Sequence, residues 1–254
     1  MKPICEAAKM AGEMAMDFLK KELSVSTKSM RADVVTQADV ECQKIIVEVL
    51  KKYYPEAVFM LEEGFEGMSI PEGETVFVID PIDGTLNYSH SLPYFAVSIA
   101  MLNFGKIVEA AVYIPWSDEM FYAKLGEGAF MNYKRIVNRR KPSIDRSLLV
   151  TGWPYDETKF NWAIRSVEKL AGLCQEVRVI GSSALELCYL AQGRFDGYWE
   201  VGLKPWDVAA GVLIAREAGI IVEGLLGEFN LESGEIVAAV PSIFGQLKSA
   251  LVSL

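Results

Sequence analysis

The amino-acid sequence predicts a mixed fold, with an α+β first half and an α/β second half. Three patterns support this prediction: apolar residues at helical spacing near the start, successive strands between residues 95 and 122, and strands alternating with helices after Pro142. A chain of 254 residues is long enough to bury a core, either as one large domain or as two lobes. We expect lobes at residues 1–140 and 141–254.

The first half opens with two predicted helices. Apolar residues recur at helical spacing from Ile4 to Leu19, and a second helix begins near Gln37. The stretch from Ser24 to Val35 is rich in Ser, Thr and Lys and is predicted to be a loop. Strands then follow, and the region from 95 to 122 is divided by turns at residues 103–106 and 115–118.

In the second half, predicted strands alternate with predicted helices. The predicted strands cover residues 148–151, 177–180 and 195–199. The predicted helices cover residues 157–172, 182–192 and 206–218.

The composition of the chain argues against nucleic-acid-binding and membrane proteins. The chain carries 25 Lys and Arg against 34 Asp and Glu, a formal net charge of −9, so we expect no nucleic-acid partner bound through its phosphates. No stretch approaches the ~20 apolar residues of a membrane span, and no signal core is evident, so we expect no membrane partner and a cytoplasmic location. The four cysteines lack C-x-x-C spacing; buried thiols are expected, with a regulatory disulfide as the weaker alternative.

The most informative segment is Thr75–Thr85. An apolar run, Val76–Ile79, predicts a buried strand that ends in Asp80, because Pro81 has no N–H to donate to a sheet. Asp83 and Gly84 follow in a turn. Two carboxylates at the mouth of a buried strand repel each other unless a cation lies between them, and hard oxygen ligands suit Mg²⁺ or Mn²⁺. The alternative is an ordinary strand-to-turn transition.

Two further segments favour the metal site. Another apolar run, Val58–Leu61, ends in Glu62 and Glu63. Downstream, Pro205 suits the first turn of a helix, which places Asp207 near the positive end of the helix dipole.

These segments carry a family resemblance. Residues 80–88 read D-P-I-D-G-T-L-N-Y, residues 206–211 read W-D-V-A-A-G, and E-A-G follows at 217–219. In this order and at this spacing, the sequence resembles the inositol monophosphatase family of metal-dependent sugar phosphatases, from about Ala7 to Gly219. The resemblance implies a layered αβαβα sandwich of the sugar phosphatase type, with two lobes and the active site between them.

The resemblance also implies a ligand set for two or three Mg²⁺ ions, with Mn²⁺ as a possible substitute. One ion would be held by Glu62, Asp80 and the backbone carbonyl of Ile82. A second would be shared by Asp80, Asp83 and Asp207, and a third, weaker ion would lie on the Glu62 side. Two metals can together bind phosphate, generate hydroxide and stabilise the leaving oxygen.

The expected nucleophile is metal-bound water. His90 is the only histidine, which excludes a scheme with separate His acid and His base, and we expect it to be structural. By resemblance, Thr85 and Asp39 orient the water and form the catalytic set together with Glu62. Lys28 matches a lysine on the family's mobile loop.

Substrate recognition is assigned by the same resemblance. Glu200 matches a glutamate that accepts hydrogen bonds from sugar hydroxyls, while Arg178 is expected to form a structural ion pair. The loop Thr151–Pro154 reads T-G-W-P and is similar to prokaryotic members, so strict inositol specificity is not expected. Ile220 replaces a common family glycine, with an effect expected on packing. The full predicted substrate-binding set is Asp83, Gly84, Thr85, Gly181, Ser182, Ser183, Glu200 and Asp207.

The sequence therefore predicts a Mg²⁺-dependent phosphomonoester hydrolase acting on inositol monophosphate or a related sugar phosphate. A fructose-1,6-bisphosphatase or dual sugar phosphatase is the nearest alternative, and a nucleotide 3′-phosphatase is a weaker one. A noncatalytic regulator that binds a partner is the alternative of a different class. Lithium inhibition and a homodimer are family expectations.

Overall fold

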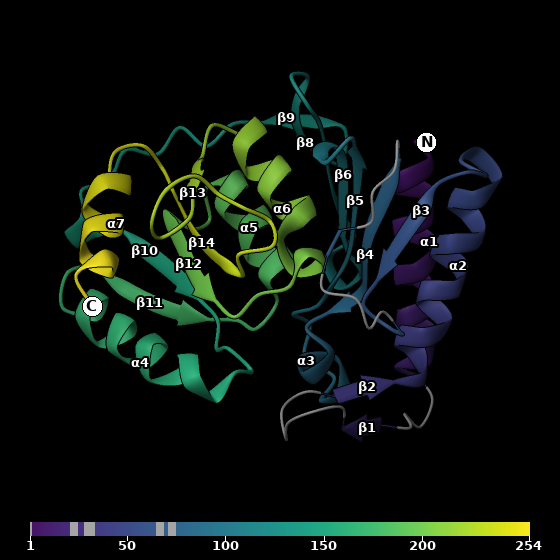
Figure 1. Cartoon of the computed structure of the whole chain (residues 1–254), viewed down its shortest axis with the longest axis horizontal. Helices are drawn as coiled ribbons and strands as arrows, with labels where there is room; N and C mark the ends of the chain where they lie inside the picture. Colours follow the sequence, from purple (N-terminus) through teal and green to yellow (C-terminus); the bar gives the residue numbers. More distant parts are fainter. Residues whose placement is uncertain (1, 21–24, 28–33, 65–68, 71–74) are drawn as a thin grey trace.

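The computed structural model describes residues 2–20, 25–27, 34–64, 69–70 and 75–254. Five layers follow one another across the molecule, as a helix pair, a sheet, a helix pair, a sheet and a last helix pair (Figure 1). The predicted αβαβα sandwich is confirmed. The helix pairs are α1 (Pro3–Phe18) with α2 (Gln37–Tyr53), α5 (Ser183–Gln192) with α6 (Pro205–Glu217), and α4 (Glu157–Ala171) with α7 (Phe244–Val252).

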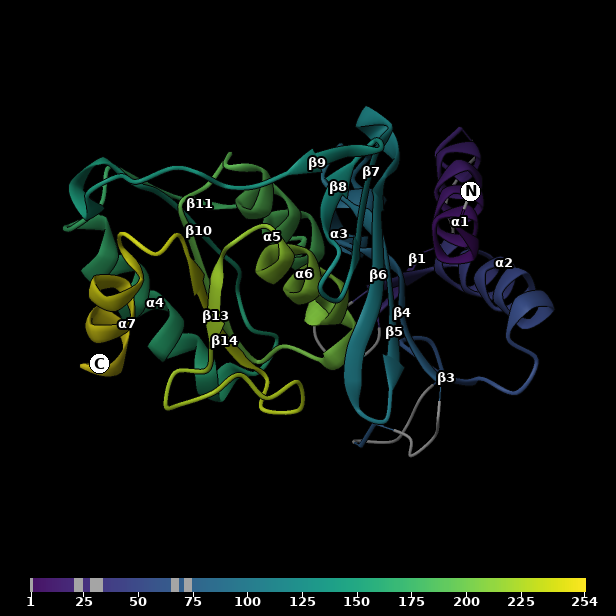
Figure 2. The same ribbon diagram turned by 90° about the horizontal axis from the view of Figure 1, so that it is seen from above.

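The larger sheet has seven strands in chain order, parallel between the first two and antiparallel thereafter. Seen from above, it separates α1 and α2 from α5 and α6 (Figure 2). Both predicted turns, at 103–106 and 115–118, join consecutive strands, the second through a short 3₁₀ turn at Pro115–Ser117. The strands are β3 (Val58–Leu61), β4 (Val76–Asp83), β5 (Ala96–Asn103), β6 (Lys106–Ile114), β7 (Glu119–Lys124), β8 (Gly128–Met131) and β9 (Lys134–Ile136).

Strand β4 corrects one prediction. It does not end at Asp80 but runs to Asp83, with a shift of register against β5 between these two residues. Asp80 lies opposite Ser98, and pairing resumes with Asp83 opposite Ala96. Pro81 is accommodated because it lies within this irregularity and donates no sheet hydrogen bond there. The bulge sets both carboxylates at the same end of one strand.

The segment before α2 corrects a second prediction. Two short strands, β1 (Val25–Thr27) and β2 (Val34–Thr36), pair antiparallel where a loop was predicted. β-Branched residues occupy much of both strands, a composition that favours extended pairing. The short helix α3 (Thr85–Ser89) lies close to β2.

The smaller sheet has the order β11-β10-β12-β14-β13. Strand β10 (Leu148–Thr151) begins after a 3₁₀ turn at Ile144–Arg146 and pairs parallel with both β11 (Glu176–Val179) and β12 (Gly197–Val201). Strand β14 (Glu235–Ala239) is antiparallel and separates β12 from β13 (Ile221–Glu223). The predicted second-half strands and helices are all present, with bounds shifted by one or two residues for β11 and β12 and by one residue for α4, α5 and α6.

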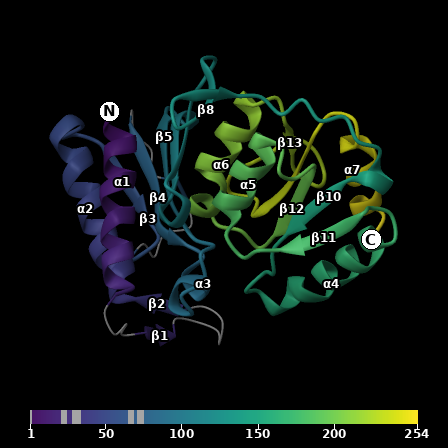
Figure 3. The ribbon, with the colours of Figure 1, turned by 180° about the vertical axis from the view of Figure 1, so that it is seen from behind.

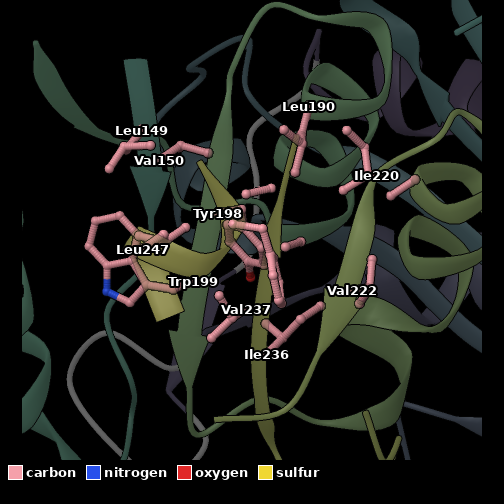
Figure 4. Packing of buried hydrophobic residues seen from close by; sticks show 14 of the residues in the cluster. Leu149, Val150, Leu190, Tyr198, Trp199, Ile220, Val222, Ile236, Val237 and Leu247 are labelled. Atoms are coloured by element: carbon pink, nitrogen blue, oxygen red, sulfur yellow. The ribbon is translucent and has the colours of Figure 1, made fainter. Parts of the chain in front are cut away.

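Apolar side chains fill both faces of the smaller sheet (Figure 4). Because β-strand side chains alternate, the neighbours Tyr198 and Trp199 point to opposite faces of β12. The Trp199 indole donates to Ser166 Oγ of α4 at 2.8 Å. Glu200 therefore shares the Tyr198 face, which is directed toward α5.

The inner helix pair joins the two sheets. Side chains of α5 and α6 pack against β4–β8 in one apolar cluster, and the layer order is the same from behind (Figure 3). Strands β3–β9 precede residue 140 and β10–β14 follow it, while the division into lobes at that residue stays a prediction. All four cysteines are free thiols. Among the described residues, no helix is long and apolar enough to cross a membrane.

Candidate active site

A small cavity of about 100 Å³ opens where the end of β4 faces the start of α6. The predicted metal-binding residues come from three separate parts of the chain, and all of them line this cavity. Glu200 joins them from β12. The resulting set of carboxylates is Glu62, Asp80, Asp83, Glu200 and Asp207, with Ile82 between the first two aspartates of the motif.

The turn after β4 is fixed by its own hydrogen bonds. Asp80 Oδ1 accepts from the Ile82 N–H at 3.0 Å, and the Ile82 carbonyl accepts from Thr85 Oγ1 at 2.9 Å. Gly84 has a φ of +94°, and a Cβ on it would lie 2.8 Å from the Tyr94 carbonyl oxygen. Only glycine suits both the left-handed backbone and this close approach.

Asp83 is anchored from across the site. Its Oδ2 accepts from Ser182 Oγ at 2.6 Å and from the Ala184 N–H at 2.8 Å, at the start of α5. Ser182 is almost fully buried, so its hydroxyl serves Asp83, whereas Gly181 and Ser183 line the cavity. The contact ties the β4 turn to the helix layer between the sheets.

Asp207 occupies the predicted place in the first turn of α6. Its Oδ2 accepts from the Lys204 N–H at 2.7 Å, which caps the helix, while the carboxylate also lines the cavity. Pro205 begins the helix, as expected. The helix dipole favours a carboxylate at this end.

The buried carboxylates raise one another's pKa. Burial raises the pKa of Asp80 well above its ordinary value, and the charges of Glu62, Asp83 and Asp207 raise it further, as does a hydrogen bond with Glu62. Burial likewise raises the pKa of Asp83 to about 6 and that of Asp207 well above the ordinary range. A cation in the site would relieve this mutual repulsion.

This donor set fits a divalent cation by its chemistry, because it offers only hard oxygen atoms and an excess of negative charge. In the described part of the chain, however, no three His, Cys, Asp or Glu side chains already stand together as a metal-binding group. Asp83 and Asp207 each direct an oxygen to a local donor, and Asp80 faces Glu62.

Thr85 and Asp39 are brought together as the resemblance implied. Thr85 Oγ1 lies 3.2 Å from Asp39 Oδ1, and both side chains are buried. Asp39 lies in the first turn of α2, while Thr85 opens α3 and lines the cavity.

Glu200 forms the opposite wall. Its Oε2 accepts from Tyr198 Oη at 2.7 Å and from Ser183 Oγ at 3.3 Å. Burial raises the pKa of Glu200 to about 7 even though these two donors favour the charged form. A Cβ on Gly152 would lie 2.4 Å from Glu200 Oε1, so the loop that begins at Gly152 packs directly on this carboxylate.

Two positioning residues escaped sequence reasoning. Asn87 Nδ2 donates to the carbonyls of Tyr94 and Ile180, both at 2.8 Å, and so holds α3 to the turn before α5. Glu186 Oε1 accepts from the N–H groups of Ile180 and Gly181 at 3.0 and 3.2 Å. Asn87 stood inside the motif, whereas Glu186 is an acidic residue in the first turn of α5 that carries no distinctive sequence signal.

Other candidates lie elsewhere. Lys28 falls outside the described residues. The Glu63 backbone pairs with the Gln43 side chain, His90 ends α3, and Arg178 pairs with Glu176 on its own strand at 3.6 Å. Ile220 is buried in the core of the smaller sheet, which supports the expected packing role.

Known proteins match this architecture and these motifs. A model of the inositol monophosphatase family matches residues 1–253. Nus factor SuhB of Vibrio cholerae serotype O1 is 41% identical over 240 residues, covering 92% of this chain and 89% of that protein. The crystal structure of the extragenic suppressor protein suhB from Bartonella henselae is 36% identical with a TM-score of 0.91, covering 98% of this chain and 96% of that chain.

An inositol monophosphatase from Anabaena (Nostoc) is also similar, at 35% identity and a TM-score of 0.86, covering 99% of this chain and 94% of that chain. The match thus extends over the full layered fold and includes the segments that build the carboxylate cavity. The chain belongs to the inositol monophosphatase family.

Proposed function

We propose that the protein is a Mg²⁺-dependent phosphomonoesterase that releases orthophosphate from a small polyol monophosphate, with inositol monophosphate as the leading substrate. The convergence of Glu62, Asp80, Asp83 and Asp207 on one cavity carries this proposal. These residues and the Ile82 carbonyl would hold the metal, which when bound supplies positive charge to the phosphate and acidity to water.

The protein's own groups supply orientation and proton handling. The Thr85 hydroxyl can donate to Asp39 while its oxygen accepts a hydrogen bond from the attacking water, which aligns the water and draws its proton toward the buried carboxylate. Ser182 and the Ala184 N–H keep Asp83 in place during this step.

The lining favours a neutral polyol body over a second phosphate. The described residues that line the cavity carry five carboxylates and no Lys, Arg or His. A bisphosphate would bring a second dianion to this wall without a cationic partner, which costs free energy. Glu200 instead offers acceptor oxygens to vicinal hydroxyls, so we place inositol phosphates ahead of fructose 1,6-bisphosphate.

The test is phosphate release by the purified protein with saturating Mg²⁺ and with EDTA. Inositol 1-phosphate, fructose 1,6-bisphosphate and 3′-phosphoadenosine 5′-phosphate are compared side by side. We expect metal-dependent release with the highest kcat/KM for inositol 1-phosphate. Equal or faster turnover of fructose 1,6-bisphosphate would instead assign a dual sugar phosphatase.

A partner-binding role is the second candidate, since the Vibrio cholerae and Escherichia coli relatives carry the name Nus factor SuhB. This name describes a factor and not a hydrolase. The comparisons therefore do not support the expectation that the protein has no nucleic-acid partner. Absence of metal-dependent release from all three substrates would favour the factor role. A homodimer and lithium inhibition remain part of the enzymatic proposal, to be measured by light scattering and by LiCl titration of turnover.

A further inference from the structure

A second, larger cavity of about 430 Å³ lies beside α1 and shares no lining residue with the carboxylate cavity. Its walls come from the start and one side of α1, from β6–β8, and from the turns that follow each of these strands. Cavities of roughly 300–1,000 Å³ are the usual size of small-molecule sites. The lining includes Lys2, Lys9, Tyr113, Met120, Tyr122 and Phe130.

The cavity exists because the helical layer does not extend over the whole sheet. Helix α1 lies mainly over β5 and β6, and α6 covers the opposite face. On β7, Phe121 and Ala123 are buried toward α6, so Met120 and Tyr122 point to the outer face. An outer face of this kind is ordinarily polar, yet here Met120, Tyr122 and Phe130 present apolar surface.

Most polar atoms in the walls already have partners within the protein. Tyr113 Oη donates to Asp118 at 2.8 Å, and Tyr122 Oη donates to Glu109 at 2.7 Å. The walls therefore offer ring and thioether surface more than hydrogen-bonding groups. Burial raises the pKa of the Cys5 thiol to about 12, so this group is also neutral.

The charged side chains around the cavity differ in whether they have a partner of opposite charge. Asp118 lies 3.8 Å from Lys9, and Glu127 lies 2.5 Å from Lys124, so each lining carboxylate has a lysine partner. Lys2 Nζ stands 4.7 Å from the centre of the Tyr122 ring and, within the described residues, has no carboxylate at ion-pair distance. One cation at the edge of an apolar chamber is thus available to a ligand.

We propose that this cavity binds a small, mainly apolar molecule with one acidic group, whose body lies on Met120, Tyr122 and Phe130 and whose acid contacts Lys2. A carboxylate, sulfonate or phosphate ester would satisfy the same chemistry. The ammonium gains an ionic partner, and the apolar face of the sheet is removed from water.

The experiment uses the whole chain and the fluorescence of anilinonaphthalene sulfonate, an aromatic anion, as the probe. Octanoate, octanol and octylamine share one apolar chain and differ in head group, so displacement of the probe by each isolates the role of charge. We expect octanoate to compete roughly tenfold more effectively than octanol, and octylamine to be weakest.

Two variants assign this binding to the cavity. Lys2→Gln should abolish the preference for octanoate over octanol, while Met120→Glu should weaken binding of all anions because it places a negative charge on the wall. Lys106→Gln, at the exposed first residue of β6, is the matched control and should change nothing. Thermal melting serves as the folding control for both variants.

The proposal would be overturned by equal competition from octanoate and octanol, by stronger competition from octylamine, or by an unchanged octanoate preference in Lys2→Gln. If the probe binds with the same affinity in Met120→Glu, the probe site lies elsewhere and the proposal fails.

Discussion

Thr85 Oγ1 lies 3.2 Å from Asp39 Oδ1, and the same hydroxyl lies 2.9 Å from the Ile82 carbonyl oxygen. This hydroxyl therefore stands between the buried acid of α2 and the carbonyl expected to face a metal. A hydroxyl has one proton, so only one of these contacts is made fully at a time. A metal ion bound to the Ile82 carbonyl would occupy that oxygen, so the Thr85 hydroxyl would donate its proton to Asp39. The Thr85 oxygen could then accept a hydrogen bond from the water and orient it.

Thr85→Val should lower kcat by about 10²–10⁴-fold, because valine keeps the shape of the side chain but cannot position water. Steady-state phosphate release under saturating Mg²⁺ measures the effect. Thr85→Ser, which keeps the hydroxyl, is the control and should retain most of the turnover. Near-normal kcat in the valine variant would exclude this role.

Mg²⁺ should raise the melting temperature of the protein, because a cation relieves the repulsion among Asp80, Glu62 and Asp207. At a concentration about 100 times Kd, binding stabilises the native state by ~2.7 kcal/mol, or roughly 5–10 °C for a chain of this size. Thermal melts with Mg²⁺ and with EDTA provide the measurement.

Asp80→Asn is the informative variant for that shift. It should melt higher than the wild type in EDTA, since one repelling charge is removed, and it should lose the response to Mg²⁺. Asp145→Asn, in the exposed 3₁₀ turn before β10, should keep the wild-type response. A full Mg²⁺ response in Asp80→Asn would contradict the assigned ligand set.

Glu200 should make the metal-free protein less stable as pH rises toward neutrality. Its folded-state pKa is raised from 4.5 to about 7, so the native state binds more protons than the unfolded state between these values. The contribution is fully present below pH 4.5 and is lost as pH rises through about 7, with an upper limit of about 3 kcal/mol. Denaturant unfolding across this range in EDTA should show the decline, and Glu200→Gln should flatten it. The same slope in both proteins would rule out Glu200 as the source.

Gly152→Ala should raise KM for inositol 1-phosphate and destabilise the fold by about 1–3 kcal/mol, because the new Cβ would displace the Glu200 carboxylate or the loop. The kinetic assay and a denaturant titration measure the two effects. Gly245→Ala is the matched control, since α7 has open space at that position and should tolerate alanine without loss. An unchanged KM in Gly152→Ala would separate this loop from substrate binding.

The sequence predicted the elements whose patterns are local. Helical spacing identified α1 and α2, and the short turns divided β5, β6 and β7 at the correct places. The ligand candidates were also found together, because they stand in two motifs and at the end of one apolar run. Their convergence on one cavity agrees with that prediction, while their roles remain to be tested by the variants above.

Features set by tertiary pairing were not predictable from local pattern. Pro81 was expected to end its strand, but the bulge that accommodates it depends on the register of β5. Strand β14 lies between β12 and β13 although it follows both in the chain, and no sequence spacing reports that order. Glu186 had no place among the sequence predictions, because its role depends on the turn at Ile180 and Gly181 that it holds from α5.

The sharing of one apolar cluster between strands β4–β8 and helices α5–α6 affects how the chain is made. The strands emerge from the ribosome well before the helices that cover them, and at roughly 5–20 residues per second the inner face of the sheet stays exposed to water for several seconds. During that interval the apolar face of the sheet is not yet covered by α5 and α6. We therefore expect this face to be the part of the nascent chain most prone to aggregation until residue 218 has been added.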